Sequence, residues 1–156
     1  MKKLISVFLA LLMLLSFPMI SYAGDSEIDE YENRYVEYYK DGSYSVTTIE
    51  ISPITTLATS TVKQTKTTSH YNSDNEKEWA ITVTGTFNYT GSSATCTNSS
   101  VSYNIYDKNW KVTSAQASKS GRTATGEFTL KRYFLGVPIK TENKTLTLTC
   151  SNTGVC

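Results

Sequence analysis

The stretch EWAITVTGTFNY, residues 78–89, decides the fold class of this chain. Apolar and polar side chains alternate along it with a period of two, which indicates a β-strand with one dry side and one wet side. The dry side carries Trp79, Ile81, Val83, Gly85, Phe87 and Tyr89, and the wet side carries Glu78, Ala80, Thr82, Thr84, Thr86 and Asn88. A glycine in mid-strand, Gly85, predicts either a bulge or a close backbone approach.

Weaker forms of this alternation recur on both sides of that strand. Residues 46–51 and 62–70 are rich in threonine, valine and isoleucine, which favour strands. Four more strands are predicted downstream by Val101, Tyr103 and Ile105; by Trp110 and Val112; by Ala124, Gly126, Phe128 and Leu130, with Phe134 in phase; and by Leu146, Leu148 and Cys150. Cys96 is out of phase with the strand that follows it, which predicts a bulge near residues 98–100.

Turn-forming sequences separate these strands, at residues 72–75, 90–93, 107–109, 120–121 and 135–138. About seven short antiparallel strands divided in this way predict an all-β sandwich, Ig-like in general shape. A small β-barrel is the alternative. We expect one β-domain over residues 46–156.

The first 23 residues predict a cleavable secretory signal peptide. Lys2 and Lys3 precede an apolar run from Leu4 to Leu15, and Ser21-Tyr22-Ala23 offers small residues where a signal peptidase reads. The run is shorter than the about 20 residues of a membrane-spanning helix, and Pro18 follows it. We therefore expect cleavage after Ala23 and a secreted, extracellular protein that has no membrane contact; a retained membrane anchor is the alternative.

Cleavage changes the charge of the chain. The full sequence has 15 Lys+Arg and 14 Asp+Glu, and loss of Lys2 and Lys3 leaves 13 against 14, a net charge of −1. This near-neutral charge argues against a nucleic-acid partner. Residues 24–45 form an acidic, Tyr-rich leader, expected to be flexible or a short helix because Ile28, Tyr31, Tyr35 and Tyr38 have helical spacing.

Three cysteines in an exported chain predict one disulfide. In the chain-entropy model, a Cys96–Cys150 bridge closes a loop of about 55 residues and stabilises the fold by about 4 kcal/mol, against about 2.4 kcal/mol for Cys150–Cys156. The sequence favours Cys96–Cys150. The alternatives are a different pairing and buried free thiols, which pack as small apolar side chains.

Groups suited to catalysis are few. His70 is the single histidine, and no nucleophile motif surrounds it. Glu78 and Glu127 are the carboxylates considered for a glycosidase-like pair, but both fall on the predicted outward side of their strands. We therefore expect no catalytic residue and no cofactor.

A metal site is also weighed at one turn. Asn72, Asp74 and Glu76 present alternating oxygen ligands, as a calcium loop does. Lys77 then occupies the position where such a loop needs glycine, and turn formation explains the same residues. We expect no metal ligand here.

Several segments resemble a group of small secreted β-rich proteins of Gram-positive bacteria. They are YNSD at 71–74, WAITVTGTF at 79–87, SSATCT at 92–97, SKSG at 118–121 and LTLTCS at 146–151. The resemblance covers roughly residues 60–152 and leaves the leader and Cys156 unexplained. No function is established for that group, so it implies no activity, but it does imply that Cys96 and Cys150 pair.

These observations favour a non-catalytic binding or surface-interaction module. Its extracellular partner is unknown, with cell-wall glycan or a host surface as candidates. One alternative is a small extracellular hydrolase that uses carboxylates or His70. The other is a secreted inhibitory or bacteriocin-like polypeptide whose leader is a pro-segment.

Overall fold

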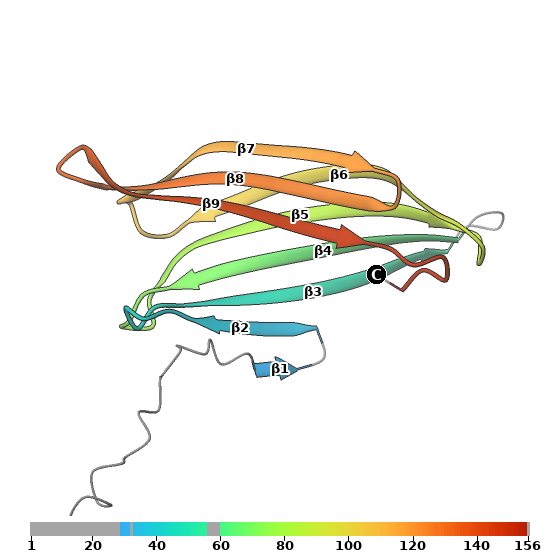
Figure 1. Cartoon of the computed structure of the whole chain (residues 1–156), viewed down its shortest axis with the longest axis horizontal. Coiled ribbons are helices and arrows are strands. Elements are labelled where there is room, and N and C mark those ends of the chain that lie inside the picture. The colour runs from blue at the N-terminus through green and yellow to red at the C-terminus, as the bar shows by residue number, and fades with distance from the viewer. Residues whose placement is uncertain (1–28, 32, 56–59, 156) are drawn as a thin grey trace, which may run out of the picture.

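The computed structural model describes residues 29–31, 33–55 and 60–155, and every regular element within these ranges is a β-strand (Figure 1). The strands are β1 (Asp29–Tyr31), β2 (Arg34–Tyr38), β3 (Tyr44–Thr55), β4 (Ser60–Tyr71), β5 (Lys77–Tyr89), β6 (Ala94–Ile105), β7 (Trp110–Ser120), β8 (Thr123–Phe134) and β9 (Val137–Thr149). The predicted signal peptide, residues 1–23, lies outside the described residues.

The strands form two antiparallel sheets that are stacked in two layers (Figure 1). Strands β1 to β6 pair in chain order in the larger sheet, and β7, β8 and β9 pair in chain order in the smaller one. The predicted antiparallel sandwich is confirmed, with nine strands in place of about seven. Within the described residues the two sheets stay separate, so the alternative barrel is not formed.

The acidic leader belongs to the larger sheet. Strands β1 and β2 lie within it, and β2 pairs with β3 from Arg34↔Thr48 to Tyr38↔Tyr44. The predicted short helix is therefore wrong for these residues, and the β-domain begins before residue 46. An isolated short helix lacks packing, whereas tyrosine and valine suit a strand beside β3.

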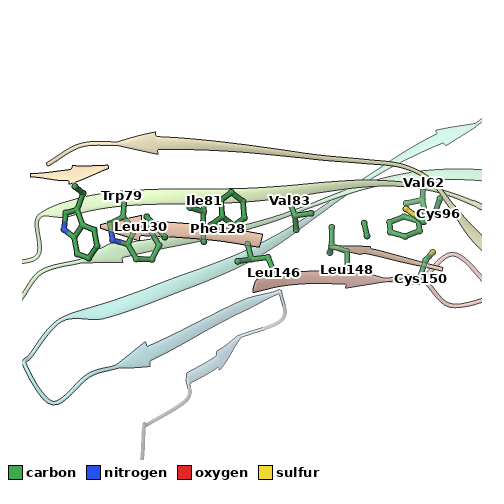
Figure 2. Close-up of a cluster of buried hydrophobic side chains, with 13 residues drawn as sticks. Val62, Trp79, Ile81, Val83, Cys96, Phe128, Leu130, Leu146, Leu148 and Cys150 are labelled. Atoms are coloured by element: carbon green, nitrogen blue, oxygen red, sulfur yellow. The ribbon is translucent and has the colours of Figure 1, made fainter. Parts of the chain in front are cut away.

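The inner side of β5 forms the centre of the core. Trp79, Ile81, Val83 and Phe87 are fully buried there, so the alternation predicted for residues 78–89 is confirmed between Ile81 and Phe87. It fails at Ala80, which was predicted on the wet side and is buried. Figure 2 shows Trp79, Ile81 and Val83 beside labelled side chains of β8 and β9. The buried cluster comprises Val62, Trp79, Ile81, Val83, Phe87, Cys96, Trp110, Ala124, Phe128, Leu130, Leu146, Leu148 and Cys150.

Two Gly–x–Phe sequences place a phenylalanine ring against a glycine inside the core. A Cβ atom at Gly85 would lie 2.5 Å from the Phe87 ring and 2.9 Å from the Cβ of Ala124. A Cβ at Gly126 would lie 3.1 Å from the Phe128 ring. Each phenylalanine ring thus lies against the glycine two residues before it, and the close approach predicted at Gly85 is confirmed.

The register of β6 explains the phase of Cys96. Thr86 pairs with Asn98 while Phe87 pairs with Cys96, so Thr97 is the additional residue of a bulge. The bulge lies one residue before the predicted 98–100 segment. It turns the Cys96 side chain to the inner side, where it is buried.

The prediction for Phe134 is wrong because the β8–β9 hairpin, which also contains a shift in register, ends beyond the core. Arg132 pairs with Lys140 while Tyr133 pairs with Pro138, so Ile139 is an additional residue near the end of this hairpin. The strands also extend beyond the core here. Phe134, predicted to share the buried phase of Leu130, is 65% exposed.

The packing at Gly85 gives a first prediction. Gly85→Ala should lower the free energy of unfolding by about 1–3 kcal/mol, because the added methyl overlaps the Phe87 ring. Urea denaturation measures this, with Thr86→Ala on the opposite side of the strand as the control. Phe87→Leu should cost less in the Gly85→Ala background than in the wild type, and additive effects would contradict the proposed overlap.

Candidate functional site

The apolar core ends at His70, near the end of β4. The imidazole is 2% exposed and stacks on Trp79, with ring centroids 4.9 Å apart and planes 18° apart. Its Nδ1 lies 3.2 Å from the Oγ of Ser45, and its Nε2 lies 3.5 Å from Oε2 of Glu78. A neutral ring that carries its proton on Nε2 fits both partners, accepting from Ser45 and facing the carboxylate with its N–H.

A bulge turns Glu78 inward. His70 pairs with Trp79 and Tyr71 pairs with Lys77, so Glu78 is the additional residue between them. Its carbonyl oxygen accepts hydrogen bonds from the backbone N–H groups of Tyr106 and Asp107. The outward orientation predicted for Glu78 is therefore wrong, since the side chain is 4% exposed.

The Glu78 carboxylate lies between His70 and Arg132. Oε1 is 3.5 Å from an Arg132 guanidinium nitrogen, opposite the 3.5 Å contact of Oε2 with His70. Burial raises the pKa of Glu78, and the charge of Arg132 only partly offsets this effect. On its other side Glu78 reaches a hollow of about 510 Å³ that it shares with Tyr106, Asn109 and Arg132, among others.

A second hollow lies on the opposite side of His70, between the two sheets. It has a volume of about 300 Å³ and is lined by Tyr39, Lys40, Asp41, His70, Lys140, Glu142 and Lys144. We call this hollow the inter-sheet cavity. Its wall from β9 is charged, although Lys140, Glu142 and Lys144 are in the same phase as the buried Leu146 and Leu148.

Ion pairs organise the β9 wall of the inter-sheet cavity. Lys140 lies 2.8 Å and Lys144 3.4 Å from the Glu142 carboxylate. Burial alone would raise the pKa of Glu142, but the Lys140 hydrogen bond and the Lys144 charge outweigh it and lower the pKa. Burial alone would lower the pKa of Lys144, but Tyr39 and Glu142 outweigh it and raise the pKa. Both groups are therefore charged at neutral pH.

An aromatic side chain forms the opposite wall. The Lys144 ammonium lies 5.4 Å from the centroid of the Tyr39 ring, within the range of a cation–π contact. The Tyr39 hydroxyl donates to Glu37 at 2.9 Å and lies 3.2 Å from the Oγ of Ser45. The cavity therefore combines an aromatic ring, fixed ammonium groups and carboxylates.

Ser45, His70 and Glu78 have the connectivity of a hydrolytic serine–histidine–acid relay. A nucleophile must reach its substrate, however, and Ser45 is 3% exposed. Its side chain lines neither the inter-sheet cavity nor the hollow beside Glu78. We interpret these three residues as a buried hydrogen-bonded network that holds His70 in place.

The other predicted candidates lie elsewhere. Glu127 is exposed on the outer side of β8, as predicted, and lines a separate hollow with Gln116 and Asn143. The structure thus brings Glu78 to His70 but does not bring Glu127 to them. Asn72 Oδ1 accepts the backbone N–H groups of Asp74 and Glu76, so these residues build the turn, as the alternative to a calcium site predicted.

The predicted Cys96–Cys150 disulfide, which the resemblance also implied, is wrong. Cys96 is a free thiol, its Sγ donates to the carbonyl of Asn98 at 3.2 Å, and burial raises the pKa of that thiol. Cys96 lies in β6 of the larger sheet, and Cys150 directly follows β9 of the smaller sheet. Cys156, and pairing with it, lies outside the described residues.

Four residues of the inter-sheet cavity were not predicted from the sequence: Tyr39, Lys140, Glu142 and Lys144. A signal for the β9 residues is present, because their even positions continue the phase of Leu146 and Leu148. Charged residues on the inner side of a strand indicate a functional site where the two sheets no longer pack against each other. Tyr39 carries no such signal, since the leader was not predicted to be a strand.

Comparisons with known proteins identify no relative of this chain. No family model, no curated protein and no solved structure matches the chain. In the part of the chain described here, no helix is long and apolar enough to cross a bilayer. Among the same residues, no three His, Cys, Asp or Glu side chains are grouped so that they could hold a metal ion.

The buried pair gives a second prediction. Burial lowers the pKa of His70 from 6.5, so as the pH falls the unfolded chain binds this proton first and the fold loses stability. Burial raises the pKa of Glu78 from 4.5, so here the folded chain binds the proton first and gains stability. The two groups therefore act in opposite directions below about pH 6.5.

Two variants separate these contributions. Between about pH 7 and pH 4, His70→Gln should remove the loss of stability that begins near pH 6.5, and Glu78→Gln should remove the gain that is complete near pH 4.5, as followed by urea denaturation. Glu127→Gln, at an exposed carboxylate, is the control and should parallel the wild type. Parallel curves for all three variants would refute the assignment.

Proposed function

We propose that this chain is a secreted, non-catalytic binding module that holds an acidic extracellular glycan in the inter-sheet cavity. The observation that carries the proposal is the change in the inner side of β9 from buried leucines to Lys140, Glu142 and Lys144, opposite Tyr39 and His70. A hollow with an aromatic wall and a few fixed polar groups has the chemistry of a small-ligand site. A mature, exported chain would meet such glycans outside the cell.

The charges of the cavity favour an acidic ligand. Glu142 is engaged by two lysines, and Asp41 accepts from the backbone N–H and the hydroxyl of Ser43. Lys40 has no carboxylate within salt-bridge distance among the described residues. The lining therefore offers more positive than negative charge, which suits a carboxylate or phosphate group, while the Tyr39 ring suits the face of a sugar.

The pKa values of the cavity carboxylates argue for binding over hydrolysis. A glycosidase needs one carboxyl group kept protonated as a general acid by a raised pKa. Hydrogen bonds from Ser43 lower the pKa of Asp41, and Lys140 and Lys144 lower that of Glu142 against the effect of burial. Two ionised carboxylates supply no general acid, but they do hold the lysines in position.

The proposal predicts charge-selective glycan binding. The secreted protein should bind carboxylate- or phosphate-bearing wall glycans more tightly than their neutral counterparts, as measured by glycan array and titration calorimetry. Lys40→Met and Lys144→Met should each weaken binding about tenfold, the equivalent of about 1.4 kcal/mol. Lys63→Met, at an exposed lysine on the outer side of β4, is the matched control.

Three results would contradict the proposal. One is equal affinity for acidic and neutral glycans, and another is equal loss of binding in Lys63→Met. The third is turnover of a glycan that Glu142→Gln abolishes, which would assign the cavity to the hydrolase alternative. Since Lys144 pairs with Glu142, urea denaturation of each variant must accompany the affinities.

A further inference from the structure

The hairpin between β8 and β9 exposes the most apolar segment of the described chain. Residues 133–139 read YFLGVPI and contain no charged side chain. The exposed fractions are 65% for Phe134, 89% for Leu135, 61% for Val137 and 60% for Ile139. We call residues 133–139 the apolar tip. In Figure 1 this hairpin reaches beyond the other loops at its end of the sandwich.

The backbone of the apolar tip holds a leucine in an unfavourable conformation. Leu135 has φ 49° and Gly136 has φ 83°, which places two left-handed residues at the turn. Such a turn prefers Asn-Gly, and the other non-glycine residues described with positive φ are both asparagines, Asn33 and Asn75. The chain thus presents a large apolar side chain where the other non-glycine residues with positive φ are asparagines.

Basic side chains surround the apolar tip. Arg132 and Lys140 flank it and pair with Glu78 and Glu142, respectively. Lys111 and Lys131 lie directly opposite each other in the β7–β8 register, and neither has a carboxylate within salt-bridge distance among the described residues. Like charges in this position repel and destabilise a sheet, so this pair is suited to binding an external anion.

We propose that the apolar tip inserts into the surface of a phospholipid bilayer that carries anionic lipids. Apolar side chains below a collar of lysine and arginine match the boundary between acyl chains and charged headgroups. The charge of Lys111 and Lys131 selects anionic lipid. A convex tip would need a complementary groove on a protein partner, whereas a bilayer deforms around it.

This inference goes beyond the glycan-binding proposal and does not depend on it. No residue of the apolar tip lines the inter-sheet cavity, and Lys140, which follows the tip, is the nearest residue that does. A docked tip would hold the cavity close to the lipid surface. The inference also replaces the expectation, drawn from the sequence, that the mature chain contacts no membrane.

Vesicle flotation tests the proposal with the secreted protein. Vesicles of phosphatidylcholine mixed with phosphatidylglycerol should bind it, and pure phosphatidylcholine vesicles should bind it at least tenfold less. Leu135→Asn should reduce binding at least tenfold without loss of stability, because asparagine tolerates a positive φ better than leucine. Val155→Asn, at a 69% exposed valine near the far end of β9, is the matched control and should bind normally.

Two further measurements identify the interactions. Lys111→Gln and Lys131→Gln should each weaken binding to the anionic vesicles several-fold and reduce its dependence on salt. Phe134→Trp should show fluorescence that brominated lipids quench, whereas the native Trp79 and Trp110 are buried and should not be quenched.

The proposal is overturned by any of several outcomes. These are binding that survives Leu135→Asn, equal binding to the neutral vesicles, and no quenching in Phe134→Trp. A protein that binds no vesicle also overturns it, including one whose tip instead mediates a dimer that Leu135→Asn disperses in sedimentation. Glycan affinity measured without vesicles reports on the cavity alone, so the two proposals fail separately.

Discussion

The packing of Trp79 joins the apolar core to the polar end of the molecule. Its indole is fully buried, stacks on His70 and meets Trp110 edge-on, with centroids 6.1 Å apart. The Lys144 ammonium lies 6.0 Å from the same ring. One side chain therefore closes the core on one side and supports the inter-sheet cavity on the other. Trp79 pairs with His70 across the strands, and the bulge directly before Trp79 in β5 turns Glu78 inward as well.

The part of this fold that the sequence predicts is the part where apolar and polar side chains alternate within a single strand. Residues 79–87 read as a strand because each apolar side chain needs the same buried side, and the structure places them there. Two features depend on the register and length of neighbouring strands: the bulge that places Cys96 inside, and the extension of the β8–β9 hairpin beyond the core, which exposes Phe134. Only the first left a trace, because Cys96 is out of phase with the strand that follows it within the same segment.

The site was less predictable because its residues come from strands far apart in the chain. Tyr39 lies in a segment whose tyrosines have helical spacing, and only pairing with β3 makes that segment a strand. Glu78 and His70 were found as chemical groups, but their contact depends on one additional residue in β5. The sequence shows that charged residues of β9 are in phase with its buried leucines. It does not show that they face Tyr39 across a cavity and not a core side chain.

Where a residue lowers the stability of the fold at its position, a function is the explanation to test first. Among the described non-glycine residues with positive φ, two are asparagines, which tolerate this conformation, yet the remaining one is Leu135. It pairs Arg132 and Lys140 with carboxylates, yet leaves Lys111 and Lys131 opposed. Both departures lie at the same end of the smaller sheet, Leu135 in the β8–β9 turn and the two lysines on β7 and β8, and neither contributes to the core. Stability alone would favour Asn-Gly at the turn and opposite charges across the strands, and these two departures are the physical basis of the proposed lipid contact.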